Sequence, residues 1–165
     1  NNTENFAPEG NIVGNVPPGT GLLVLANDNI EVFENQFWDN DNVNVMIYSF
    51  TLGGRTVSDP EYDPFPEQIY VHDNEFRGGG TVPRHRSLVP WHEASGLNTP
   101  NIVWDGLVKA GASGDNIVCL GNETSASFMN LMGGEDPTAV SYDKAPHLCA
   151  LPRLPKIEFD VPGDD

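Results

Sequence analysis

One short pattern recurs along the 165-residue chain and constrains its fold more than any other feature. The pattern is a polar residue, Ile, any residue, an apolar residue, any two residues and Asn. It begins at Asn29, returns 39 positions later at Gln68, and returns again at Asn116 after a further 48. Repeats of this length are typical of solenoids, in which each coil buries its apolar rows only against the neighbouring coils.

This alignment predicts which side chains stack inside the solenoid. We expect two inward rows and one corner row, formed by Ile30, Ile69 and Ile117, by Val32, Val71 and Cys119, and by Asn35, Asn74 and Asn122. Asn tolerates the left-handed backbone of a sharp turn, and stacked side-chain amides form hydrogen bonds from coil to coil. Three asparagines in one register therefore favour a common corner.

Short strands, rather than helices, are expected throughout. Gly (17) and Pro (14) interrupt nearly every stretch, and no long segment carries the helical apolar spacing. Alternation predicts strands at residues 21–25, 30–33, 43–48 and 69–72. The strand at 22–25 recurs at 44–47, about 22 residues on, which is the length of one coil with three short strands.

The sequence thus predicts an all-β fold, a right-handed parallel β-helix of about three coils with inserted loops and an extended C-terminal tail. Residues 1–134 would form the coils and residues 135–165 the tail or cap. The stretches 51–65 and 78–100 are rich in Gly, Pro and polar residues, so we expect them to be loops outside the stack.

The charge balance limits the classes of partner. Lys and Arg total 8 against 24 for Asp and Glu, a formal net charge of −16. Such a charge opposes binding to nucleic acid or to anionic lipid, and no run of about 20 apolar residues predicts a membrane span. A solvated acidic surface is the simplest interpretation.

The two cysteines, Cys119 and Cys149, belong to no Cys-x-x-Cys pair, which argues against a zinc ribbon or a thioredoxin-like motif. A disulfide that fastens the tail to the last coil is the preferred interpretation, and it would persist in an oxidising compartment. Two unpaired buried thiols are the alternative.

The segments at 1–50, 66–76 and 101–108, with the cysteine-containing end, resemble uncharacterised bacterial exported proteins with tandem parallel β-helix repeats. The resemblance implies export to the periplasm, cell surface or medium, and a signal peptide and further coils upstream of Asn1. It supplies no catalytic residues. The first coil would otherwise be an open end, so we expect it to stack on upstream coils or on another chain.

The insert at 78–100 holds the first candidate site. Arg84, His85, Arg86, Trp91 and His92 gather there, and this set predicts substrate binding, because cations neutralise a sugar carboxylate and an indole stacks on a sugar face. The alternative is a loop anchored by Trp91 and paired with the acidic surface.

Two further segments hold candidate functional residues. Asp39 and Asp41, in an amide-rich corner, are candidate calcium ligands, with an ordered solvated turn as the alternative. Trp104 and Asp105 are neighbours and face opposite ways along a strand, so we expect Trp104 in the core and Asp105 in a turn with Gly106.

Two functions compete. The first is a binding or structural surface protein, whose partner is a glycan, an envelope protein or another copy of the chain. The second is a polysaccharide lyase or epimerase, which rests on analogy with carbohydrate-active β-helices. No catalytic constellation stands out in the sequence, so the first is preferred.

Overall fold

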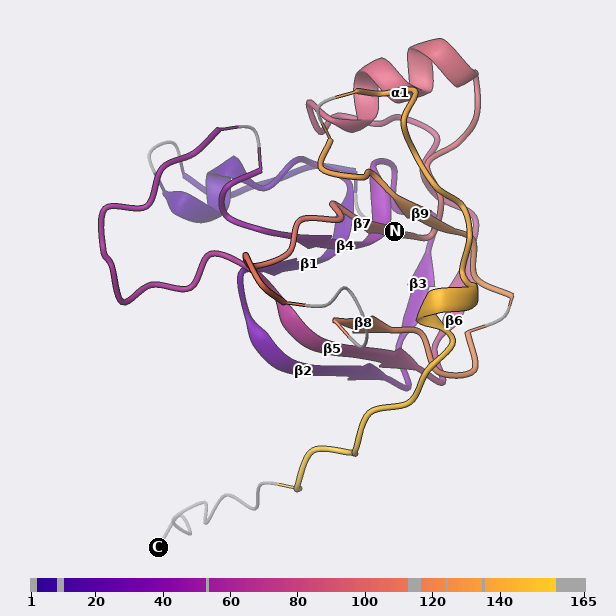
Figure 1. Ribbon diagram of the computed structural model, residues 1–165. Helices are drawn as coiled ribbons and strands as arrows, with labels where there is room; N and C mark the ends of the chain where they lie inside the picture. The colour runs from indigo at the N-terminus through magenta and orange to yellow at the C-terminus, as the bar shows by residue number, and fades with distance from the viewer. Residues whose placement is uncertain are drawn as a thin grey trace, which may run out of the picture.

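The computed structural model describes residues 3–8, 11–52, 54–112, 117–123, 125–134 and 136–156 (Figure 1). Short strands dominate, with one α-helix. The elements in chain order are η1 (Ile12–Asn15), β1 (Thr20–Leu25), β2 (Asp28–Phe33), β3 (Gln36–Trp38), β4 (Val43–Tyr48), β5 (Glu67–His72), β6 (Glu75–Arg77), α1 (Leu88–Ser95), β7 (Ile102–Trp104), β8 (Val118–Cys119), β9 (Phe128–Asn130) and η2 (Ala145–His147).

The strands stack into three parallel sheets. Sheet A has the order β1-β4-β7-β9, sheet B the order β2-β5-β8, and sheet C pairs β3 with β6. Three strands complete one circuit before β4 returns to lie on β1, where Thr20 pairs with Val43, a step of 23 residues. The predicted parallel β-helix of about three coils is confirmed (Figure 1).

The predicted inward rows hold for two coils and fail at the third. Ile30 pairs with Ile69, and Val32 with Val71. In β8, however, Val118 rather than Ile117 lies opposite Ile69, and Cys119 lies opposite Tyr70 on the outer face. The predicted register was wrong by one residue, because all four apolar residues from 117 to 120 are buried and alternation therefore cannot choose a register.

The asparagine corner shows the same slip. The backbone N–H and side-chain Nδ2 of Asn35 both donate to Asn74 Oδ1, each at 3.1 Å. In the next coil, the Glu123 carboxylate accepts the Asn74 backbone N–H at 2.6 Å, while the Asn122 side chain donates to the Asp73 carboxylate. The left-handed backbone lies one residue before the first two asparagines, at Glu34 (φ 55°) and Asp73 (φ 53°), and not at the asparagines themselves.

Sheet A is buried on both faces. Its inner side chains join the interior core with those of the other sheets. Its outer side chains form a second core with the 78–100 insert, which folds back over the sheet and contributes Leu88 and Trp91, 0% and 2% exposed. The insert predicted to be a loop outside the stack thus contains α1 and covers a sheet, and each large side chain it buries stabilises the fold by roughly 1.5–3 kcal/mol.

Sheet B is covered by the tail. We call residues 148–154 the strap. Cys149 forms the predicted disulfide with Cys119 of β8, with Cα atoms 5.0 Å apart, and Leu154 donates its backbone N–H to Glu31 of β2 at 3.0 Å. The strap therefore crosses from the third coil to the first, and Figure 1 shows the tail passing β8, β5 and β2. Among the described residues, no helix is long and apolar enough to cross a bilayer.

Candidate functional site

The insert and residues 49, 50, 52 and 55 enclose a cavity on the outer face of sheet A, which we call the arginine cavity. Its volume is about 80 Å³. Leu23, Leu25 and Met46 line its apolar part, and Arg55 and Arg86 lie at its margin. Asn15, Val16 and Pro17, at the end of η1, also line the cavity.

The two arginines of this cavity lack acidic partners. Arg86 donates to the Leu52 carbonyl at 2.8 Å, and the Arg55 guanidinium lies 5.5 Å from the centre of the Phe50 ring. Neither forms an ion pair with a carboxylate of the described residues, whereas Arg77, Arg84, Lys109 and Arg153 all do. In a chain with net charge −16, two arginines that line one cavity and form no ion pair with a described carboxylate are a local exception.

His85 lies beside these two arginines as a neutral side chain. Burial, followed by the charges of Arg86 and Arg55, lowers the pKa of His85 to about 4. Its Nδ1 lies 2.7 Å from Ser87 Oγ and accepts the Ser87 backbone N–H, so the ring proton resides on Nε2. Tyr48 continues this chain, with its hydroxyl 3.0 Å from Ser87 Oγ.

The other residues predicted for this site lie elsewhere. Trp91 is 2% exposed in the outer core and donates its Nε1 to Tyr142, so its ring faces are covered by protein rather than open to a sugar. His92 forms a hydrogen bond through Nδ1 with the Leu97 carbonyl, just after α1 ends. Arg84 lies 3.9 Å from Asp41. His85 and Arg86 alone, of the five, line the cavity, where Phe50 and Tyr48 supply the aromatic surface.

The candidate calcium corner is built from amides. Asn42 is fully buried and donates its Nδ2 to the Thr20 hydroxyl. Its Oδ1 accepts the backbone N–H groups of Arg84 and His85, which fixes this part of the insert. Asp41 faces Arg84. Within the described ranges no three His, Cys, Asp or Glu side chains are grouped to hold a metal ion.

A second amide ladder lies beside this corner, and the sequence had not indicated it. Asn44 donates to the Asn101 side chain and to the Gly78 carbonyl, both at 2.9 Å, and accepts from Asn40 at 2.7 Å. These bonds join two consecutive coils of sheet A to the start of the insert.

Trp104 is confirmed as an interior residue, 3% exposed. Asp105 is fully buried and accepts both the backbone N–H and the hydroxyl of Ser49 at 2.7 Å. Burial raises the pKa of Asp105, although these hydrogen bonds oppose the rise. The carboxylate joins β7 to the chain leaving β4, which is a structural role.

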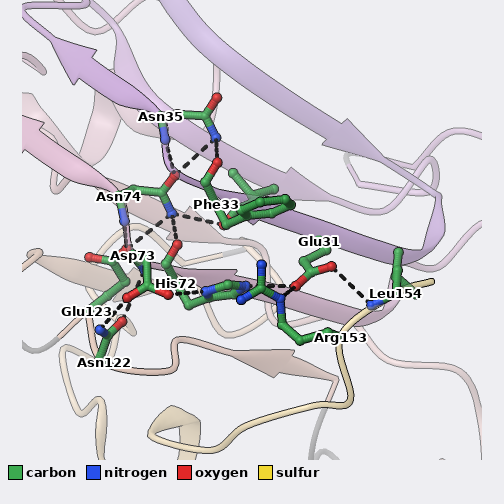
Figure 2. Close-up of polar contacts among 11 residues, drawn as sticks. Glu31, Phe33, Asn35, His72, Asp73, Asn74, Asn122, Glu123, Arg153 and Leu154 are labelled. Carbon is green, nitrogen blue, oxygen red and sulfur yellow. Dashed lines mark hydrogen bonds and ion pairs between the residues drawn. The ribbon is translucent and has the colours of Figure 1, made fainter. Parts of the chain in front are cut away.

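A polar cluster that the sequence did not reveal lies under the strap (Figure 2). His72 is 2% exposed, with its Nε2 2.9 Å from Glu31 Oε1 and its Nδ1 2.7 Å from Asp73 Oδ2. Ionised carboxylates only accept hydrogen bonds, so both contacts are satisfied together only when the ring carries a proton on each nitrogen. Arg153 pairs with the same Glu31.

The two carboxylates of this cluster are held in the ionised form. Burial pushes the pKa of Glu31 upward, but the hydrogen bonds from His72 and Leu154 and the charge of Arg153 outweigh it and lower that pKa. The His72 hydrogen bond, followed by that of Asn122, lowers the pKa of Asp73. The 39-residue repeat could have placed Glu31 near His72, whereas nothing in the sequence linked Arg153 to them.

Comparisons with protein-family models, with curated proteins and with solved structures gave no significant match. The parallel β-helix architecture therefore rests on the structure itself, and the comparisons assign the chain to no family.

Proposed function

We propose that the chain is an exported β-solenoid that binds a carboxylate-bearing glycan at the arginine cavity. The observation that carries this proposal is a pair of guanidinium groups, Arg55 and Arg86, beside an apolar and aromatic surface. Neither has an acidic partner in the part of the chain that the structure describes. A guanidinium matches a carboxylate with two parallel hydrogen bonds, so an acidic sugar is a chemically suitable ligand.

The size and charge of the cavity narrow the class of ligand. A volume of about 80 Å³ is several times the roughly 10–15 Å³ that one water molecule needs by the same measure, so the cavity has room for a carboxylate group and the neighbouring atoms of its sugar. The remaining surface is strongly acidic and repels dense polyanions at long range. Isolated carboxylates on a glycan thus suit the site better than a nucleic acid backbone.

Export is part of the proposal. A disulfide persists in oxidising compartments, which agrees with the periplasm, the cell surface or the medium of a bacterium. The resemblance to bacterial exported β-helix proteins points the same way. An acidic envelope polymer is then the nearest source of a carboxylated ligand.

A lyase or epimerase is the second candidate, and one observation favours it. His85, Ser87 and Tyr48 form a hydrogen-bonded chain beside two cations that would neutralise a uronate carboxylate. However, a general base works best with a pKa near the working pH, and the pKa of about 4 makes His85 a weak base. Binding therefore remains the first choice.

Calorimetry with galacturonate and mannuronate oligomers, against neutral galactose oligomers, tests the binding proposal. We expect Arg55→Gln and Arg86→Gln each to weaken binding about tenfold or more, as loss of a charged hydrogen bond does. Arg77→Gln is the matched control, because Arg77 pairs with Glu75 on sheet C. Equal affinity for acidic and neutral oligomers would refute the proposal, and a rise in ultraviolet absorbance from an unsaturated product would favour the lyase.

A partner at the first coil is a separate proposal. β1, β2 and β3 each pair on one side only within the described residues. Such edges are templates for another coil, either from upstream sequence or from a second copy. Sedimentation of the purified 165-residue chain over a range of concentrations checks this, and a stable monomer throughout would contradict stacking between copies.

A further inference from the structure

The strap is attached at its ends rather than packed along its length. No residue from 148 to 154 is buried, and Leu148 and Leu154 are 47% and 45% exposed. One attachment is Cys149, which forms the disulfide with Cys119 and accepts the Gly121 backbone N–H at 3.1 Å. The other is Glu31, which accepts from Arg153 and from the Leu154 amide (Figure 2). Hydrophobic burial contributes little to holding this segment.

The residues around Arg153 form a site for a guanidinium group. The Glu31 side chain is 7% exposed and forms an ion pair with Arg153. The Arg153 guanidinium carbon also lies 4.6 Å from the centre of the Phe33 ring, within the range of a cation–π contact. His72 stacks parallel to Phe33 at 5.5 Å and fixes the Glu31 carboxylate through Nε2. The carboxylate and the aromatic platform are thus held in place by the sheet.

The strap leaves much of the face of sheet B unfilled. A hollow of about 430 Å³ lies toward the disulfide and is lined by Tyr70, His72, Asp73 and Asn122. A second, of about 180 Å³, lies at the other end beside Asn29 and Gln68. Tyr70 lines both. The face therefore has room and polar groups for an extended segment with larger side chains than those of the strap.

We propose that the outer face of sheet B is a binding site for an arginine-bearing extended peptide, and that the strap occupies it as an internal substitute. The charges support a basic partner, since the chain carries a net charge of −16 and Glu31 and Asp73 are ionised. The disulfide keeps Arg153 close to its site, at an effective concentration on the order of millimolar, so an outside peptide must compete with it.

The first experiment vacates the guanidinium site and leaves the disulfide intact. Nα-acetyl-arginine amide is titrated into the Arg153→Ala variant and the thermal midpoint is followed. We expect the thermal midpoint to rise for this variant and to stay unchanged for the unaltered chain. The lysine analogue should need at least about a tenfold higher concentration for the same rise. The neutral citrulline analogue should give no shift. An equal shift with citrulline, or none with arginine, would overturn the proposal.

The second experiment opens the whole face. The Cys119→Ser, Cys149→Ser and Arg153→Ala changes are combined, folding is checked by circular dichroism, and a labelled LPRLPK peptide, the sequence of residues 151–156, is measured by fluorescence anisotropy. We expect at least about tenfold weaker binding of LPALPK, and loss of this preference when Glu31→Gln is added. Equal binding of the two peptides by the folded variant would rule out a guanidinium site, and dimers formed by strap exchange in the unaltered chain would assign the face to a second copy instead.

Discussion

Sheets A and B are both covered on their outer faces, but different interactions hold the two covers. The insert over sheet A buries Leu88 and Trp91 against outward strand residues and forms a second hydrophobic core. The strap over sheet B buries none of its own residues and is held by a disulfide and by charged contacts to Glu31. One cover is part of the folded core, and the other is an attachment.

This difference separates the conditions to which each cover responds. Reductant and salt screening do not weaken apolar burial, so the sheet A cover should be lost only with the fold itself. A disulfide and a partly exposed ion pair respond to reductant, pH and ionic strength, so the strap should be released while the coils remain folded.

Truncation of a large side chain should give the largest difference between the covers. We expect Trp91→Ala to lower the free energy of unfolding by about 3–5 kcal/mol, because it leaves a cavity in the outer core and removes the partner of Tyr142. Leu148→Ala in the strap is the matched control and should change it by less than about 0.5 kcal/mol. Urea denaturation measures the free energy of unfolding of both variants. A similar loss in the two would mean that the strap is part of the hydrophobic core.

Removal of the disulfide should come next. We expect the Cys119→Ser and Cys149→Ser pair to lower stability by about 3–4 kcal/mol in the chain-entropy account, since the bond closes a separation of 30 residues. Limited proteolysis should then cut the strap first, while residues of α1 stay protected. Simultaneous cutting at α1 would show that the two covers depend on each other.

The covers also differ in how far the sequence could predict them. The 39-residue repeat correctly placed Ile30 on Ile69 and Val32 on Val71, because those strands alternate clearly. The third repeat gave a register one residue out, because residues 117–120 are all apolar. A repeat pattern thus identifies the coils. It fixes the register between them only where one face of the strand is polar.

The inserted and terminal segments were less predictable. The 78–100 insert resembles a polar loop, since Gly, Pro and polar residues dominate it and Pro90 separates Leu88 from Trp91. The disulfide was expected, whereas the contact between Arg153 and Glu31 joins residues far apart in the sequence with no shared motif. The sequence indicated two residues of the arginine cavity, His85 and Arg86. It did not indicate Arg55, which belongs to the 51–65 stretch.

A smaller effect should appear when the pH falls from 6.5 to 4. The pKa of His85 is lowered to about 4 in the folded chain, so the unfolded chain takes up this proton first and stability decreases across that interval. We expect a loss on the order of 1–3 kcal/mol from this group, since the ring is only partly buried. His85→Asn should flatten the profile. An unchanged profile in that variant would assign the loss to another group.

The smallest effect on the whole molecule should be release of the strap end by acid. The pKa values of Glu31 and Asp73 lie below their ordinary 4.5 and 3.8, so their stabilising contacts are complete above those values and are lost as the pH falls through the lower, folded ones. The Leu154 backbone N–H donates to Glu31, so its exchange rate should rise toward the intrinsic rate of an unprotected amide at pH 3, while the interior amides of β5 keep their protection. Hydrogen exchange followed by mass spectrometry measures this, and Glu75→Gln, which alters an exposed pair on sheet C, is the control. Equal protection at pH 7 and pH 3 would mean that the Cys149 attachment alone holds the strap on sheet B.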